Sequence, residues 1–559
     1  MREVRFQVCA CAAIAALAVL PSACSRKAET LSHTTRDGHL SPLLAKLGDF
    51  HRTISTKSEI AQRYFDQGLV LVYGFNHPEA IRSFQEAARN DANLAMAYWG
   101  EALATGPNIN DAAAEPEREK AAYQASRKAV AAKSGATPAE QALIDAMAIR
   151  HSEPEGARRQ ERMDAYAEAM RKVRQQFPED PDVGTLYASA VMDSMPWNYY
   201  AKDGTPKPIM VGAIAALEDV IAKNPRHPGA HHYYIHAVEA SPTPDRAVPS
   251  AEKLAALVPG AGHIVHMPSH IFIRVGRYED ATKANRQAIS ADEDYITQCR
   301  AQGIYPAAYY PHNIHFLTAS LAMQGKSREM IEASQKVGQH HADSMLNQPG
   351  FGFAHLLHAI PELSLVRFGR WGEILKLPEP HGSAFHTGMW HFARGMAFNG
   401  QGKQAEASAE LAELKKIAAQ PELEQLKVFD VNALSNLAQI AVNVLAGEIA
   451  AKSRNYPASI ASLRKAVQLE DALLYSEPPD WPNPPRHNLG AVLLEAGRFK
   501  DAETVYREDL RRHRNNGWSL YGLAVSLEKQ GRPQDAATTM AGFKQAWSQA
   551  DIEITSSRF

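Results

Sequence analysis

Cysteine is nearly absent from most of this 559-residue chain. Three of its 4 cysteines (Cys9, Cys11 and Cys24) lie near the start, and only Cys299 lies in the remaining body. A single thiol cannot form an internal disulfide, and it cannot build a closed structural zinc site of the cysteine type. The body of the protein must therefore be held together by packing, without disulfides.

An excess of charge of either sign is also missing. Lysine and arginine total 60 against 62 aspartates and glutamates, which gives a formal net charge of −2 at pH 7. Such a balance provides no basic field for nucleic acid or anionic lipid, so we expect no nucleic-acid partner. No Ser-His-Asp order, phosphate-binding glycine loop or dinucleotide fingerprint stands out either. The sequence therefore contains no common enzyme motif that would indicate a reaction.

A short leader precedes the fold. A basic start is followed by an apolar run at residues 8–20, which is too short to span a bilayer. Small residues directly precede Cys24, and this junction resembles the lipidated cysteine of bacterial lipoproteins, although Pro21 stands where those sequences usually carry leucine. We predict a signal peptide at 1–23, lipidation of Cys24 and a polar tether at 24–50. The protein should be exported to the periplasm and anchored to the membrane by its lipid.

Histidine is the residue that the chain has in excess, with 23 copies. His232 and His236 form an H-x-x-x-H pair, and His266 and His270 form a second pair 34 residues later. Each residue of a helix turns by about 100°, so the two histidines of a pair share one face. Two pairs at this identical spacing indicate one histidine-lined surface that crosses neighbouring structural repeats.

The 34-residue spacing recurs near the C-terminus. Gly497 and Gly531 are 34 residues apart, as are Ala502 and Ala536, and no strand-like alternation persists in the chain. This pattern resembles the tetratricopeptide repeat (TPR), a helix–turn–helix unit that stacks into a solenoid. The resemblance implies an all-α fold, a right-handed TPR helical solenoid with irregular inserts.

Two irregular inserts interrupt the repeats. Residues 196–208 and 477–486 are rich in proline, which cannot continue a helix, so we expect loops, the later one folded over the groove of the solenoid. Around them we predict N-terminal TPR-like repeats at 51–180, histidine-rich central repeats at 181–400 and C-terminal TPR repeats at 401–559.

The candidate metal ligands are the histidines of this surface and one carboxylate. His263 and His312 each lie three residues before another histidine, and Glu239 shares the helix face of His236. The candidate set is His232, His236, Glu239, His263, His266, His270, His312 and His315. His487 falls at an equivalent repeat position and is an additional groove candidate. The TPR resemblance places all these positions on the concave surface.

Imidazole is the commonest metal ligand, and two histidines four residues apart on a helix can bind one ion without distorting the backbone. Seven histidines and a carboxylate exceed one tetrahedral shell, so we predict one or two transition-metal ions with an open position. Imidazole-rich shells favour copper or zinc here, with iron and nickel as alternatives. Such a site would serve an enzyme that activates water or dioxygen, or a metal carrier.

A wider resemblance rests on four runs of sequence. Residues 75–88, 95–110, 231–241 and 262–281 are similar to a family of exported bacterial TPR proteins with a histidine-rich centre. The resemblance covers nearly the whole mature chain and implies fold and location, but no reaction. TPR grooves bind a peptide or helix, so the alternative function is a periplasmic scaffold for a protein or peptide partner, without metal. In either case we expect an unknown small molecule or polypeptide in the groove.

Overall fold

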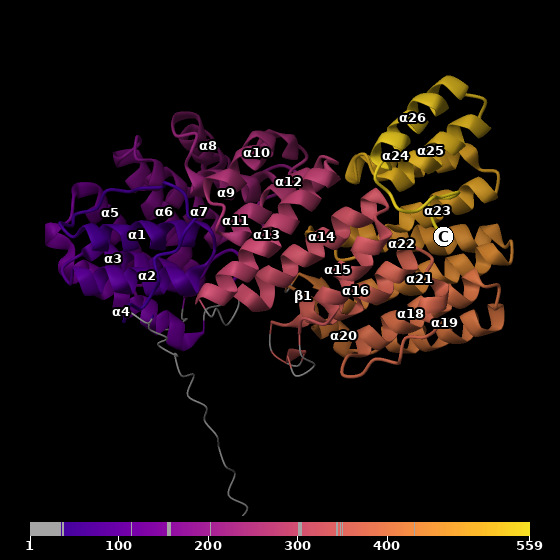
Figure 1. Ribbon diagram of the computed structural model, residues 1–559, viewed down its shortest axis with the longest axis horizontal. Coiled ribbons are helices and arrows are strands. Elements are labelled where there is room, and N and C mark those ends of the chain that lie inside the picture. Colours follow the sequence, from indigo (N-terminus) through magenta and orange to yellow (C-terminus); the bar gives the residue numbers. More distant parts are fainter. Residues whose placement is uncertain are drawn as a thin grey trace, which may run out of the picture.

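The computed structural model describes residue 35 and residues 38–559, apart from 113–114, 154–157, 202, 300–304, 342–344, 347, 349 and 430. The predicted signal peptide and Cys24 lie outside the described residues. Within them the chain is helical, and most helices pack against the helix that follows in sequence (Figure 1). Strand structure in this part of the chain is limited to β1 (Lys427–Val428) and β2 (Asn432–Ala433), which pair antiparallel.

The elements follow one another in three groups along the molecule (Figure 1). The first group is α1 (Glu59–Tyr73), α2 (His77–Asn90), α3 (Ala95–Thr105), α4 (Pro116–Ala132), η1 (Lys133–Gly135), α5 (Pro138–Arg150), α6 (Arg159–Gln176), α7 (Pro181–Ser194), α8 (Pro208–Lys223), α9 (Pro228–Val238), η2 (Pro244–Ala247), α10 (Val248–Leu257), α11 (Gly262–His266) and α12 (Pro268–Arg274). The middle group is α13 (Tyr278–Cys299), the π-helical turn η3 (Tyr305–Tyr309), α14 (Tyr310–Gln324) and α15 (Ser327–Gly338). The last group is α16 (Gly352–Arg367), α17 (Trp371–Ile374), α18 (Ala384–Gly400), α19 (Gln404–Ala418), α20 (Glu422–Gln425), the two strands, α21 (Leu434–Lys452), α22 (Tyr456–Ala472), α23 (Pro485–Glu495), α24 (Phe499–Arg512), α25 (Gly517–Lys529) and α26 (Pro533–Ala546).

Helix pairs stack through an aromatic ring that lies between two glycines. A Cβ atom at Gly68 of α1 or Gly100 of α3 would lie within 2.7 Å and 2.4 Å of the Phe84 ring of α2. Near the other end of the chain, Tyr506 of α24 lies in the same way between Gly490 of α23 and Gly522 of α25. Only glycine allows this close approach, which is repeated at both ends of the solenoid. The predicted all-α repeat solenoid is confirmed.

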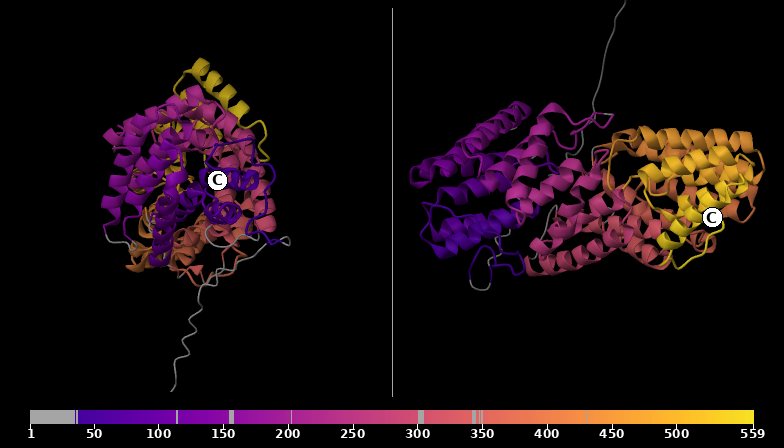
Figure 2. Two further views of the ribbon diagram at one scale, coloured as in Figure 1. Left: turned by 90° about the vertical axis from the view of Figure 1, so that its left-hand side faces the viewer. Right: turned by 90° about the horizontal axis from the view of Figure 1, so that it is seen from above.

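The hydrophobic core changes at the start of α14. One core extends from Ile54 to Tyr309, and a second begins at Tyr310 and reaches Trp518. Figure 2 shows the corresponding helices as consecutive parts along the long axis, indigo to magenta and then orange to yellow. The histidine-bearing helices α9, α11, α12 and α14 therefore lie where these two parts meet.

Helix α21 is long and apolar enough to cross a membrane by length and composition, the only such helix among the described residues. It packs against α18, α19 and α22, and 61% of its apolar window is buried inside the protein. A core helix of a folded domain has these same properties, so α21 gives little support for a membrane span.

Candidate metal centre

The two histidine pairs keep helical spacing although a proline interrupts the second one. Helix α9 begins after His227, whose Nδ1 accepts from the Ala230 amide at 3.1 Å, and Pro228 follows at the first helical position. Pro268 has no amide proton and divides the second segment into α11 and α12. Met267 between them keeps right-handed helical angles, so the chain continues in nearly the same direction.

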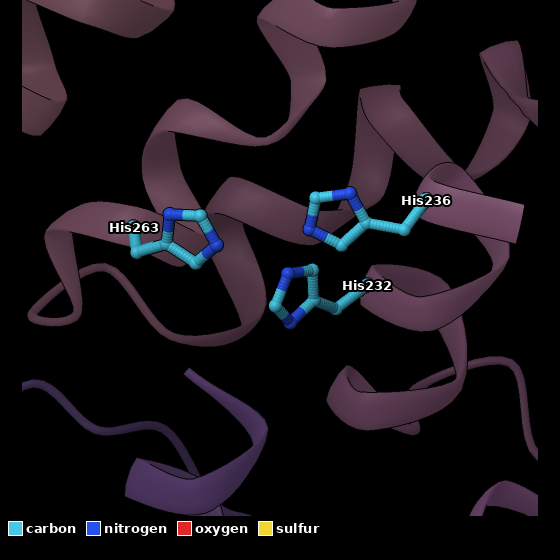
Figure 3. A group of neighbouring side chains, drawn as sticks. All are labelled: His232, His236 and His263. Carbon is cyan, nitrogen blue, oxygen red and sulfur yellow. The ribbon is translucent and has the colours of Figure 1, made fainter. Parts of the chain in front are cut away.

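A first group of three histidines gathers between α9 and α11. His232, His236 and His263 are all buried, and each offers a ring nitrogen within 4.8 Å of the others'. Figure 3 shows the three rings turned toward one another, two from α9 and one from α11. His232 Nε2, His236 Nε2 and both ring nitrogens of His263 are buried without a hydrogen-bond partner.

The partners of the outer nitrogens assign the tautomers in this group. His232 Nδ1 donates to the Tyr73 carbonyl at 2.5 Å, and a carbonyl only accepts. His236 Nδ1 donates to Glu239 Oε1 at 2.8 Å. The proton of each neutral ring is therefore on Nδ1, and Nε2 carries a lone pair that points into the group. Histidines that bind metals are commonly oriented by such outer partners.

A second group of three histidines lies beside the first. His266, His270 and His312 also bring ligand nitrogens within 4.8 Å of one another. His266 Nδ1 donates to Asn285 Oδ1 at 2.6 Å, and the amide is oriented by its own bond from Nδ2 to the Ala281 carbonyl. His266 Nε2 therefore carries a lone pair, and it accepts from His270 Nε2 at 2.9 Å.

His270 carries a proton on each nitrogen. Its Nε2 donates to His266, and its Nδ1 donates to Glu239 Oε2 and lies 3.3 Å from Glu477 Oε2. Burial alone would lower the pKa of His270, but the two carboxylates raise it to about 9. The same contacts, with His236, lower the pKa of Glu239 to about 2 against the effect of its burial. In the metal-free protein a proton therefore lies between His266 and His270, where a metal ion would bind.

The other rings are neutral. Burial, reinforced by neighbouring imidazoles, lowers the pKa well below its usual value in four of them, which are His232, His263, His266 and His312. Burial also lowers the pKa of His236, against the opposing effect of Glu239. Neutral imidazole is the form that binds metal, so these rings are competent ligands at neutral pH.

The TPR resemblance placed these histidines on the concave surface, and the structure shows that most of them are buried. His232 and His266 are fully buried because other segments cover the rings. Phe75, in the turn after α1, stacks on His236 and His263 at ring-centroid distances of 5.8 Å and 5.2 Å. This aromatic cover comes from a turn with no histidine spacing, so the sequence pattern gave no signal for it.

The two proline-rich inserts complete the cover. The Trp197 ring lies edge-on to His236 at a centroid distance of 5.2 Å. Glu477, the first residue of the later insert, reaches His270, which confirms that this insert folds over the histidines. Sequence reasoning placed the insert near the site but did not identify Glu477 as its contact. The sequence indicated the role of Glu477 only by a single carboxylate at the start of the insert.

Two candidate residues do not join the groups. His315 lies one helical turn beyond His312 and lines a neighbouring cavity, where burial lowers its pKa to about 4. His487 belongs to α23, and its Nε2 bonds Oδ2 of Asp509 in α24 at 2.9 Å. His487 therefore lies outside both histidine groups and supports the packing of the C-terminal repeats. His231, the neighbour of His232 in α9, bonds Ser250 Oγ and the Pro225 carbonyl and belongs to neither group.

Comparison with known families identifies the repeats directly. Residues 484–508 and 517–541 match the tetratricopeptide repeat, and these segments correspond to α23 with α24 and α25 with α26. The C-terminal part of the chain therefore contains tetratricopeptide repeats, within an all-α repeat solenoid. Comparison with curated proteins gives no match.

Solved structures show a distant likeness. The human IFIT1 dimer with m7Gppp-AAAA is 13% identical, with a TM-score of 0.29, over 89% of this chain and 91% of that chain. The yeast Tom70 structure is 10% identical, with a TM-score of 0.28, over 89% and 91% of the two chains. At these values the likeness carries no inference about a ligand or partner of this protein.

Proposed function

We propose that the protein binds two transition-metal ions, one in each group of three histidines. The observation that carries the proposal is the first group, in which four ring nitrogens are buried without a partner. Each unsatisfied buried polar atom costs about 1–3 kcal/mol, which a purely structural cluster would have no reason to accumulate at one point. A cation at this point would use the inward-facing lone pairs of His232 and His236.

The second group supports a second ion. It repeats the arrangement of an H-x-x-x-H pair with a third histidine from the next histidine-bearing helix. Glu239 joins the groups, because its two carboxylate oxygens accept from His236 and His270. Three imidazoles leave one position of a tetrahedral shell open, as in catalytic zinc sites. An all-imidazole shell favours copper or zinc over iron or nickel and would supply Lewis-acid or redox chemistry to a bound small molecule.

The scaffold alternative uses a different part of the molecule. A polypeptide bound to the outer surface of the repeats would not contact rings that Phe75, Trp197 and Glu477 cover. Partner binding by the TPR solenoid is therefore compatible with the metal proposal, but it gives no reason for the buried histidines.

Metal content tests the proposal directly. Protein stripped with a chelator and reloaded with zinc or copper should retain two ions per chain after desalting, one for each group. His232→Ala should retain one, because it removes a ligand from the first group only. The neighbouring variant His231→Ala is the control and should retain both, since His231 lies outside the groups. Failure of the wild-type chain to retain any metal at neutral pH contradicts the proposal.

The two ions should differ in their pH dependence. An ion at the second group must displace a proton from His270, whose pKa is about 9, so its affinity should rise by about tenfold per pH unit from neutral pH toward 9. The first group has no such proton, and its affinity should stay level there and fall only on acidification. Chelator competition at several pH values, with His232→Ala and His312→Ala isolating each group, measures both slopes. Equal slopes would contradict the assignment of the extra proton to His270.

We also propose that the protein works outside the cytoplasm as a lipoprotein. The support is the basic start, the apolar run and the small residues before Cys24 in the sequence. Cys24→Ser should move the protein from the membrane fraction to the soluble fraction, as followed by fractionation and immunoblotting. An unchanged distribution would remove the lipid anchor.

A further inference from the structure

A cavity lies beside the second histidine group, between α14, α16, the β1–β2 turn and the later proline-rich insert. It contains about 320 Å³ of empty space, part of it open to solvent. Its inner part has room for about one water molecule as the protein stands. His312 and His315 from α14 line the cavity together with Glu477 from the insert. The cavity therefore leads from the surface to a ligand of the second proposed ion.

The charge of the lining limits what the cavity can bind. Glu477 and Asp480 both contribute carboxylates, and none of the described residues that line the cavity is lysine or arginine. Asp480 accepts from Asn432 Nδ2 at 2.7 Å and from Ser476 Oγ at 2.8 Å. In the metal-free protein an anionic ligand would meet no lysine or arginine in this lining and would be repelled by the two carboxylates. The ligand of the metal-free cavity should therefore carry no negative charge.

The mouth of the cavity is aromatic. Phe353 of α16 is buried, and the ring of Phe429 covers it in a parallel stack at 4.7 Å with an interplanar angle of 8°. Phe429 itself is 47% exposed and sits in the β1–β2 turn at a φ of 48°, which is unfavourable for a bulky residue. Leu474, bonded through its backbone to Asn432 of the same hairpin, is 60% exposed. The exposed Phe429 ring, on a residue with an unfavourable backbone φ, thus covers the face of the Phe353 ring at the cavity mouth.

We infer that this cavity admits a small molecule with an aromatic ring and a head group that carries no negative charge. The ligand's ring replaces Phe429 on the face of Phe353, and its head group enters the inner cavity beside His312 and Glu477. Displacement of the Phe429 ring provides the space that the closed cavity lacks. The role of this molecule as a substrate rests on the proposed metal site, whereas its binding depends only on the cavity.

Phenol and benzoate are suitable probes, because they share a ring and differ in head-group charge. Phenol should bind the metal-free full-length protein in isothermal titration calorimetry, and benzoate should show no measurable binding. Phe353→Leu keeps an apolar core residue but removes the stacking face, and it should weaken phenol binding by about three- to tenfold. Phe429→Gly suits the positive φ and removes the competing ring, so it should tighten phenol binding.

Phe543→Ala is the control, since Phe543 of α26 packs edge-on against Tyr521 and does not line the cavity, and it should leave phenol binding unchanged. Equal binding of phenol and benzoate, or affinities that neither Phe353→Leu nor Phe429→Gly alters, would overturn the inference. If the chain takes up no metal but phenol binding still responds to both variants, the metal proposal fails and the cavity assignment holds. If metal binds and phenol does not, the cavity assignment alone fails.

Discussion

The variant His263→Phe should lose the first ion and yet melt at a higher temperature than the wild type when both are metal-free. His263 has two buried ring nitrogens without partners, and phenylalanine replaces them with carbon. The new ring can keep the stack on Phe75 at 5.2 Å and the edge contact with Tyr309 at 4.9 Å. Removing the unsatisfied atoms should gain about 1–3 kcal/mol, less a cost for the slightly larger ring.

His231→Phe is the control, and its expected effect on the melting temperature is opposite in sign. Both nitrogens of His231 have partners, Ser250 Oγ at 2.9 Å and the Pro225 carbonyl at 3.0 Å, so its replacement should lower the melting temperature and leave both ions bound. Thermal melts and metal content of the two variants, with and without zinc, give the comparison. A metal-free His263→Phe protein that melts as low as His231→Phe would identify His263 as a structural residue.

A higher melting temperature of metal-free His263→Phe would show that the buried histidines reduce the stability of the metal-free fold, and metal binding would explain why the chain keeps them. A metal ion that binds the folded state but not the unfolded state stabilises the protein in proportion to the logarithm of the ratio of ion concentration to Kd. The wild-type chain would then depend on both ions for part of its stability, whereas the stability of His263→Phe would not depend on the first ion. Residues placed for function often reduce the stability of the ligand-free fold.

The sequence predicted the fold and most of the histidines that the structure brings together, because both follow from periodicity. The 34-residue spacing placed His232 and His266 at equivalent helix positions, and the four-residue spacing placed His236 and His270 on the same faces. The glycine-and-aromatic packing of the repeats follows from the same pattern. These features depend on residues near one another in the chain, which a single sequence displays.

The division of these histidines into two groups of three could not be predicted from periodicity. His263 lies three residues from His266 in α11, yet it completes the group of His232 and His236. His312 completes the group of His266 and His270, which leaves His315 outside. The choice depends on how neighbouring helices face each other across the interface. Spacing within one helix does not contain that information.

The burial of the site was also beyond the sequence. The contacts that cover it join Phe75 to His236 and Glu477 to His270, and each pair is far apart in the chain. The assignment of protons is equally non-local, since it depends on the Tyr73 carbonyl and on Asn285. A repeat pattern places side chains on a face, but only the folded chain shows what covers that face and which nitrogen of a ring remains available.

Glu239→Gln should weaken at least one ion by about 10- to 100-fold, the usual cost of losing an outer partner of a metal ligand. Glu239 accepts from Nδ1 of both His236 and His270. Glutamine has nearly the same shape, but one of its two terminal atoms is a donor NH2 group. The imidazole that faces this NH2 must present a lone pair at Nδ1 and carry its proton on Nε2, where the ion would bind.

The same substitution should change the protonation of the metal-free site, which separates this effect from simple unfolding. Loss of the carboxylate charge should lower the pKa of His270 from about 9, and nitrogen NMR of the imidazoles would report both that pKa and the tautomer of His236. Glu218→Gln is the matched control, because Glu218 of α8 accepts from Tyr234 at 2.7 Å outside the histidine groups and should leave both ions in place. If Glu239→Gln left both affinities and the His270 titration unchanged, the carboxylate would not link the two groups. The ions would then have to be treated as independent sites.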